Sequence, residues 1–208
     1  MVKTTIQDRD DAIDVAQDIL NNKFNYVIFD TETTGLGEND VIIQVGILDL
    51  EGNVLMNTLI KPTKRKRISA EATAIHGITM KMLLDAPTFK EIYPRFTEII
   101  RNKTVLIYNA KFDTRLYWQT AAQDGFEEMS YNFLCVMLLN SVFVGEWSDY
   151  HGNFKYQQLP GGDHTAIGDC KATLELLKKM AITEKTPPAK ESSADEKTLS
   201  PKKKWWQL

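Results

Sequence analysis

The chain has 208 residues, of which 43% are hydrophobic and 25% charged, so it has too much apolar material for a wholly disordered protein and too few residues for two large domains. Its net charge of −3 excludes a protein that holds nucleic acid by bulk positive charge alone. The longest apolar run, residues 133–145, is too short for a membrane span and residues 1–11 lack the features of a signal peptide, so we expect no membrane contact and a cytoplasmic location.

The first half of the chain predicts a helix followed by a meander of strands. Residues 8–22 place apolar side chains at helical spacing among five acids, which is typical of an amphipathic helix. Residues 26–30, 41–50 and 54–60 are short segments rich in β-branched and aromatic residues and are separated by glycine-containing turns. We expect three successive antiparallel strands.

Helices then alternate with strands. The spacing predicts helices at 69–76, 79–84, 88–101, 111–122 and 165–181, a strand at 104–108, and a short strand or helix start at 131–135. Antiparallel strands followed by alternating strands and helices predict an α/β fold with a mixed sheet flanked by helices. Cys135 and Cys170 lie in apolar segments and are interpreted as core thiols.

The composition changes after Ala181. Residues 183–208 contain six Lys and four acids and almost nothing apolar before Trp205 and Trp206, whereas residues 1–182 carry 19 basic and 24 acidic side chains. Such a tail buries too little surface to offset its ordering entropy. We therefore expect one domain at 1–182, which includes the helix at 8–22, and a disordered, flexible tail with a tryptophan-containing tip at 183–208.

Four carboxylates lie where burial is expected. Asp30 ends an apolar strand and Glu32 lies two residues later, so both point to one face if the strand continues. Asp113 shares a helix face with apolar residues, and Asp169 borders the buried stripe of the last helix. Unpaired buried carboxylates cost several kcal/mol each, and no Lys or Arg is placed to pair with them.

A pair of divalent cations solves this problem. A ligand set of carboxylates without Cys or His suits Mg²⁺ or Mn²⁺ better than Zn²⁺, and two such ions suit displacement at a phosphodiester. His164 follows a Gly-Gly-Asp loop and precedes Asp169 by five residues, so it reaches the same place only from the loop or the first helical turn. A histidine there can accept a proton from water at neutral pH, and Asp163 is a candidate cap of the helix.

These segments resemble one known family. Phe-Asp-Thr-Glu-Thr-Thr-Gly-Leu at 29–36, Asn-Ala-Lys-Phe-Asp at 109–113 and His-Thr-Ala-Ile-Gly-Asp at 164–169 are similar, in order and approximate separation, to the three motifs of the DEDDh (DnaQ-like) 3′–5′ exonucleases. Ile-His-Gly-Ile-Thr at 75–79 resembles a further stretch typical of that family. The resemblance covers about residues 26–181.

The resemblance implies a ribonuclease H-like fold and assigns roles. Asp30, Glu32, Asp113 and Asp169 would hold two metal ions, with His164 as the general base. Thr33 would sit at the terminal sugar, Leu36 would wedge against the last bases, and His76 and Asn109 would line the substrate pocket. The chain departs from the family at Tyr108, where His is common, and at Gln44, where an acid is common; neither is an expected metal ligand.

Three features each allow more than one interpretation. His76 is either a substrate contact or a helix-terminal histidine that is favourable against the helix dipole. The basic run at 61–67 either contacts phosphate or is a solvated loop that protects an edge strand. Trp205 and Trp206 form a docking peptide for a protein partner, a stacking handle for single strands, or a frayed terminus without function.

The sequence therefore predicts a metal-dependent 3′–5′ exonuclease that removes nucleoside 5′-monophosphates from the 3′ end of DNA, preferably single-stranded, and that takes part in replication or repair. An RNA 3′-end-trimming enzyme remains an alternative, because the motifs do not read the 2′-hydroxyl. A non-catalytic module that recruits a replication or repair partner is the alternative from another class.

Overall fold

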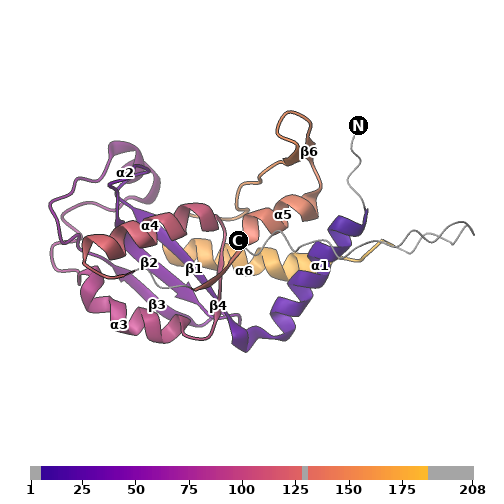
Figure 1. Ribbon diagram of the computed structural model, residues 1–208, viewed down its shortest axis with the longest axis horizontal. Coiled ribbons are helices and arrows are strands. Elements are labelled where there is room, and N and C mark those ends of the chain that lie inside the picture. The colour runs from indigo at the N-terminus through magenta and orange to yellow at the C-terminus, as the bar shows by residue number, and fades with distance from the viewer. Residues whose placement is uncertain (1–5, 128–130, 187–208) are drawn as a thin grey trace, which may run out of the picture.

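The computed structural model describes residues 6–127 and 131–186 (Figure 1). Its centre is a five-stranded mixed sheet in the order β3-β2-β1-β4-β5. The strands are β1 (Tyr26–Thr33), β2 (Ile42–Leu48), β3 (Val54–Leu59), β4 (Thr104–Ile107) and β5 (Asn132–Cys135). β1 pairs antiparallel with β2 and parallel with β4, so it is the central strand at which the meander meets the parallel half. The predicted mixed sheet is confirmed.

Helices cover both faces of the sheet. They are α1 (Ile6–Asn21), the short 3₁₀ helix η1 (Lys23–Asn25), α2 (Ala70–His76), α3 (Phe89–Ile100), α4 (Ala110–Gln123), α5 (Val136–Val144) and α6 (Ala166–Ala181). In Figure 1, α4 lies in front of the strands and α6 behind them. A small hairpin of β6 (Trp147–Ser148) and β7 (Asn153–Phe154) projects beyond α5.

The alternation of side chains along β1 divides the interior into two cores. Val27 and Phe29 pack with α3 and α4, whereas Ile28 packs with α1, α5 and α6. Because side chains of one parity share a face, Asp30 and Glu32 point to the side of α6 and Thr31 points to the side of α4. The strand thus places polar groups on both faces at its carboxyl end.

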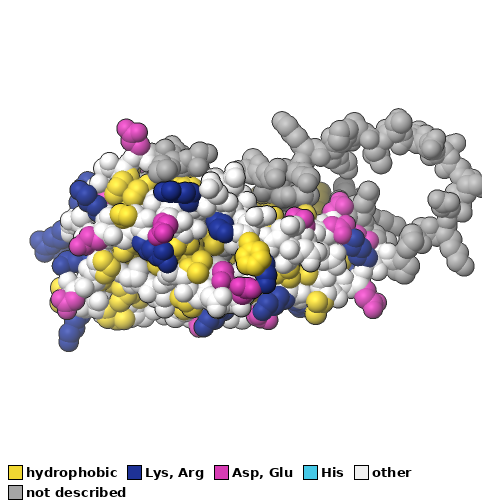
Figure 2. All heavy atoms as spheres, turned by 90° about the horizontal axis from the view of Figure 1, so that it is seen from below, with side chains coloured by type: hydrophobic (Ala, Val, Ile, Leu, Met, Phe, Trp, Pro, Cys, Tyr) yellow, Lys and Arg dark blue, Asp and Glu magenta, His cyan; other side chains and the backbone are white. Residues whose placement is uncertain are grey.

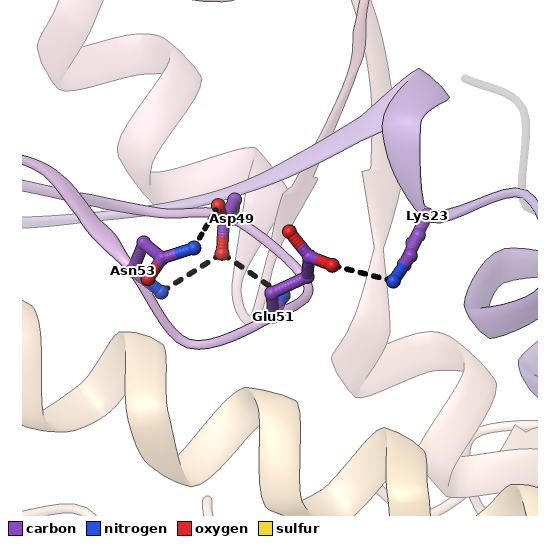
Figure 3. Close-up of polar contacts among 4 residues, drawn as sticks. All are labelled: Lys23, Asp49, Glu51 and Asn53. Atoms are coloured by element: carbon purple, nitrogen blue, oxygen red, sulfur yellow. Dashed lines mark hydrogen bonds and ion pairs between the residues drawn. The ribbon is translucent and has the colours of Figure 1, made fainter.

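The turn between β2 and β3 closes the meander by local hydrogen bonds (Figure 3). The Asp49 carboxylate accepts hydrogen bonds from the backbone N–H groups of Glu51 at 2.9 Å and Asn53 at 2.8 Å, and from the Asn53 side chain at 2.8 Å. Gly52 supplies the positive φ of 94° that the turn requires. Lys23 pairs with Glu51 at 2.5 Å and ties the turn to the start of β1.

Most predicted elements are confirmed, and the differences have local causes. The segment 79–84 was predicted as a helix, which is wrong: it forms successive tight turns with hydrogen bonds between residues three apart. The apolar run 133–145 contains β5 followed directly by α5, a change that a continuously apolar stretch does not reveal. Cys135 and Cys170 are buried and free, as expected.

Acidic and basic side chains are interspersed with apolar ones on the face shown in Figure 2. In the part of the chain that the structure describes, no helix is long and apolar enough to cross a membrane. After α6, Lys185 pairs with Asp14 and the Thr186 N–H donates to Asp10 at 3.3 Å, so residues 183–186 run beside α1. The rest of the predicted flexible, disordered tail, with Trp205 and Trp206, lies outside the described residues.

Candidate active site

Three carboxylates from two elements meet at the carboxyl end of β1. β1 continues through residue 33, so Asp30 and Glu32 stay on one face, as the sequence predicts. Asp169 comes from the first turn of α6, which packs on that face. One oxygen of each carboxylate lies within 4.8 Å of the others. These three groups can therefore share a cation.

The close approach of α6 to the sheet brings Asp169 to this position. A Cβ atom at Gly46 of β2 would lie 2.6 Å from the Ala166 carbonyl carbon and 2.7 Å from its oxygen, so only glycine fits there. The Gln44 side chain accepts a hydrogen bond from the Ala166 N–H at 3.2 Å. Gln44, one of the departures from the family pattern, thus helps to hold the start of α6 on the sheet.

Asp113 approaches from the opposite face. It lies in the first turn of α4, is 3% exposed, and accepts a hydrogen bond of 2.7 Å from the Thr31 hydroxyl. The expectation that Asp113 faces inward is confirmed. Asp113 is not one of the three groups within 4.8 Å of one another, but its charge acts on Asp30 and Glu32. The four predicted carboxylates are therefore close enough for their charges to interact.

Burial and repulsion between neighbouring carboxylates disfavour ionisation of Asp30, Glu32 and Asp113. Burial, followed by repulsion from Asp113, Asp169 and Glu32, raises the pKa of Asp30 well above its ordinary value. Burial and the neighbouring carboxylates raise the pKa of Glu32 to about 8, and burial raises the pKa of Asp113 to about 7. Carboxylates held so close together need a positive charge to ionise fully. A divalent cation would supply it.

His164 stands in the loop before α6 with a left-handed backbone, φ 59°, and an exposed side chain. The Asp169 carboxylate accepts hydrogen bonds from the backbone N–H groups of Asp163 at 2.9 Å and His164 at 3.2 Å, which fixes the loop against the acidic group. The helix cap is Thr165, whose hydroxyl accepts from the Gly168 N–H at 3.1 Å. The expectation that Asp163 caps α6 is wrong, because its carboxylate instead binds the Thr165 N–H and hydroxyl.

The four carboxylates and His164 line one cleft of about 480 Å³. It is lined by Asp30, Thr31, Glu32, Tyr108, Asn109, Phe112, Asp113, Gln158, Leu159, Gly162, His164 and Asp169. The sequence did not lead us to propose Thr31, Phe112, Gln158 or Leu159 as site residues. Thr31 and Phe112 lie within motif segments and were detectable, whereas the two loop residues carry no periodic signal.

Tyr108, the second departure from the family pattern, connects the strand edge to this loop. Its hydroxyl donates to the Gln157 carbonyl at 2.8 Å and accepts from the Asn140 amide at 3.3 Å. Burial raises the pKa of Tyr108. The tyrosine therefore anchors the chain that leads into the His164 loop.

The four predicted substrate contacts lie in different environments. Asn109 lines the cleft, Leu36 is 78% exposed at the tip of the β1–β2 loop, and the buried Thr33 hydroxyl donates to the Gly35 carbonyl at 2.8 Å. His76 lies outside the cleft lining. Its Nδ1 accepts from the Ile78 N–H at 3.0 Å and its Nε2 lies 3.1 Å from the Thr33 carbonyl.

This contact pattern assigns a neutral His76 ring that donates through Nε2. Burial lowers the pKa of His76, which also favours the neutral ring. His76 therefore braces the end of β1 from α2, and its contact with substrate stays a prediction.

Known proteins resemble this chain in sequence and in fold. A family model described as an exonuclease matches residues 27–177. An uncharacterized exonuclease of Escherichia phage 186 is 37% identical in an alignment of 172 residues that covers 74% of this chain and 87% of the phage protein. The DNA polymerase III subunit epsilon of Buchnera aphidicola is 36% identical in an alignment of 104 residues that covers 45% of this chain and 44% of that subunit. The chain thus covers less than half of that polymerase subunit.

A solved structure agrees with the sequence comparison. The structure of Exonuclease X in complex with 5′ overhanging duplex DNA superposes with a TM-score of 0.53 at 28% identity, over 74% of this chain and 90% of that one. The region matched by the family model, residues 27–177, contains the four carboxylates and His164.

Proposed function

Because the chain belongs to the DEDDh (DnaQ-like) exonuclease family, we propose that it hydrolyses the 3′-terminal phosphodiester of DNA in the 3′–5′ direction and releases nucleoside 5′-monophosphates. The preferred substrate is a single-stranded 3′ end. The observation that carries the proposal is the convergence of four carboxylates and one imidazole on a single cleft from three separate segments of the chain.

The donor set fits two divalent cations of the magnesium or manganese type. Asp30, Glu32, Asp113 and Asp169 offer only carboxylate oxygens, the ligands that these hard ions prefer over Cys and His. The raised pKa values of Asp30, Glu32 and Asp113 support the need for positive charge in the cleft. When bound, such ions make a water nucleophilic and stabilise the charge on the leaving 3′ oxygen.

The protein side chains carry the proton transfer and the alignment of the strand. His164 lines the cleft with an exposed side chain and accepts the proton of the attacking water through its imidazole. Asp169 supports this role by fixing the His164 backbone. Asn109 contacts the terminal nucleotide inside the cleft. Thr33, Leu36 and His76 lie at the end of β1 and contact the DNA strand where it enters the cleft.

Digestion of 5′-end-labelled DNA oligomers tests the proposal. With Mg²⁺ or Mn²⁺ we expect a ladder of products shortened stepwise from the 3′ end, and no products with a chelator. Asp113→Asn and His164→Ala lower kcat at least about 100-fold, the usual contribution of a general base or metal ligand. Asp85→Asn is the matched control, because Asp85 is exposed and lies outside the cleft. Full activity of either cleft variant rejects the site assignment.

A parallel digestion of matched RNA oligomers separates the alternative substrate. The two nucleic acids differ by the 2′-hydroxyl of the sugar. If RNA is digested faster than DNA, RNA becomes the proposed substrate in place of DNA.

We also propose that catalysis resides in residues 1–182. Truncation after residue 186 keeps the contacts of Lys185 and Thr186 with α1 and preserves turnover of short oligomers. A large loss of turnover assigns residues beyond 186 to the site.

A further inference from the structure

The basic run at residues 61–67 forms the connection from β3 to α2, and three of its side chains hold it in place. Lys61 donates to the Leu84 carbonyl at 2.8 Å and Lys66 to the Asn39 carbonyl at 2.5 Å. The Thr63 hydroxyl donates to the Asp124 carboxylate at the end of α4. The connection is therefore fixed to three different parts of the fold.

The remaining three cations of the run have no partner among the residues that the structure describes. Lys64, Arg65 and Arg67 are exposed, and none of the ion pairs or side-chain hydrogen bonds found among residues 6–127 and 131–186 includes them. The body of the protein has excess negative charge, so acidic partners are plentiful. An anchored segment that presents only unpaired cations is suited to an external anion.

Protection of an edge strand explains this arrangement less well. β3 is an edge of the sheet, but it ends at Leu59, before the first cation of the run. Charges that block pairing of an edge lie on the strand itself. Lys64, Arg65 and Arg67 lie several residues beyond it, toward α2.

Hydrogen bonds to the β1–β2 loop hold the basic run close to the acidic cleft. The Ser69 N–H donates to the Thr34 carbonyl at 2.9 Å, and Lys66 holds the other end of the same β1–β2 loop. Arg67 lies two residues before Ser69, and Glu32 lies two residues before Thr34. Because the Ser69–Thr34 hydrogen bond joins these two segments, the backbone of Arg67 lies within about 20 Å of the backbone of Glu32. In Figure 2, Lys and Arg side chains project from the left-hand end of the molecule, where α2 lies in Figure 1.

We propose that Lys64, Arg65 and Arg67 bind backbone phosphates of the substrate strand, upstream of the bond that is cut. This upper limit on the distance corresponds to at most about six stacked nucleotides at 3.4 Å each. The inference rests on the proposed nuclease function and specifies where the strand leaves the cleft. It also resolves an electrostatic problem, since a cleft of carboxylates repels the polyanion that it must receive, and a cationic segment outside the cleft attracts it.

The salt dependence of KM tests the contact. Each phosphate contact with a single strand contributes about 0.7 to the slope of log K against log salt. Between about 50 and 200 mM salt, KM of the wild type for an oligomer of about 12 nucleotides therefore rises up to about 20-fold more than KM of Lys64→Gln/Arg65→Gln/Arg67→Gln. The matched control is Arg101→Gln/Lys178→Gln/Lys179→Gln, which removes the same charge from exposed positions at the ends of α3 and α6.

A small substrate separates this inference from the proposed function. The p-nitrophenyl ester of thymidine 5′-monophosphate reaches only the cleft, so all three proteins should hydrolyse it at equal rates. A wild type that hydrolyses neither substrate refutes the nuclease function itself. A wild type that hydrolyses both, with equal salt slopes in the wild type and the loop variant, refutes the phosphate contact alone. Equal loss of slope in the control variant refutes it too, because the effect would then come from net charge.

Discussion

The acidic cleft should destabilise the metal-free protein as the pH rises. The pKa of Glu32 is about 8 in the folded protein, against an ordinary value of 4.5, because the side chain is buried among other carboxylates. The folded state therefore keeps a proton that the unfolded chain has already lost. The stabilisation from this proton is complete below about pH 4.5 and disappears as the pH rises through about 8.

The size of the effect follows from the shift. At 1.36 kcal/mol per pKa unit, the shift of Glu32 corresponds to at most about 5 kcal/mol of unfolding free energy. For a chain of this length each kcal/mol changes Tm by about 2 to 4 °C. The metal-free wild type should therefore lose on the order of 10 °C in Tm between pH 5 and 9 from Glu32 alone. Bound cations favour the ionised carboxylates, so stabilisation by metal should grow over the same pH range.

The substitution Glu32→Gln makes the expectation sharp. Removing the ionisable group should raise Tm in chelator at pH 9 above that of the wild type, and should abolish most of the stabilisation by Mg²⁺ or Mn²⁺. Thermal unfolding at a series of pH values, with chelator and with metal, measures both effects. Glu38→Gln is the matched control, since Glu38 is exposed in the β1–β2 loop. If Glu32→Gln melts below the wild type in chelator at pH 9 and still gains full stability from metal, the electrostatic account is wrong.

Three further substitutions test how the site is held. Thr31→Val removes the hydrogen bond to Asp113 and should lower kcat about tenfold with little change in KM, while Thr31→Ser restores it; steady-state kinetics measure this split. Gly46→Ala forces a methyl group onto the backbone of α6 and should cost at least about 2 kcal/mol of unfolding free energy in urea titrations. Arg115→Ala removes the hydrogen bonds to the carbonyls at the tip of the Leu36 loop and should raise KM for oligomers severalfold without changing Tm by more than about 3 °C.

The acidic members of the site were predictable from the sequence because each acid interrupts an apolar pattern. Asp30 and Glu32 share a parity in a strand, and Asp113 shares a helix face with core residues, so burial followed from spacing alone. His164 was less accessible to such reasoning, because its position depends on a left-handed backbone and on hydrogen bonds to Asp169. Neither feature leaves a periodic signal.

The errors in the fold arose where local pattern and tertiary environment disagree. Residues 79–84 have helical spacing, but the segment is short, and its buried Leu83 packs with the preceding Ile78 and with Ile43 as a separate small cluster. Tertiary packing favours tight turns there over a helix with a costly nucleus. The junction of β5 and α5 was hidden for the opposite reason, since nearly every residue in it is apolar and both periods fit.

The topology explains why four acids far apart in sequence meet. Because β4 pairs parallel with β1, the helix that follows β4 begins near the carboxyl end of β1 and brings Asp113 to one face. Because β2 pairs antiparallel with β1 and carries Gly46, the start of α6 can press onto the other face with Asp169. The parallel pairing of β4 with β1 and the glycine on β2 thus bring Asp113 and Asp169 to Asp30 and Glu32 from opposite faces of one strand.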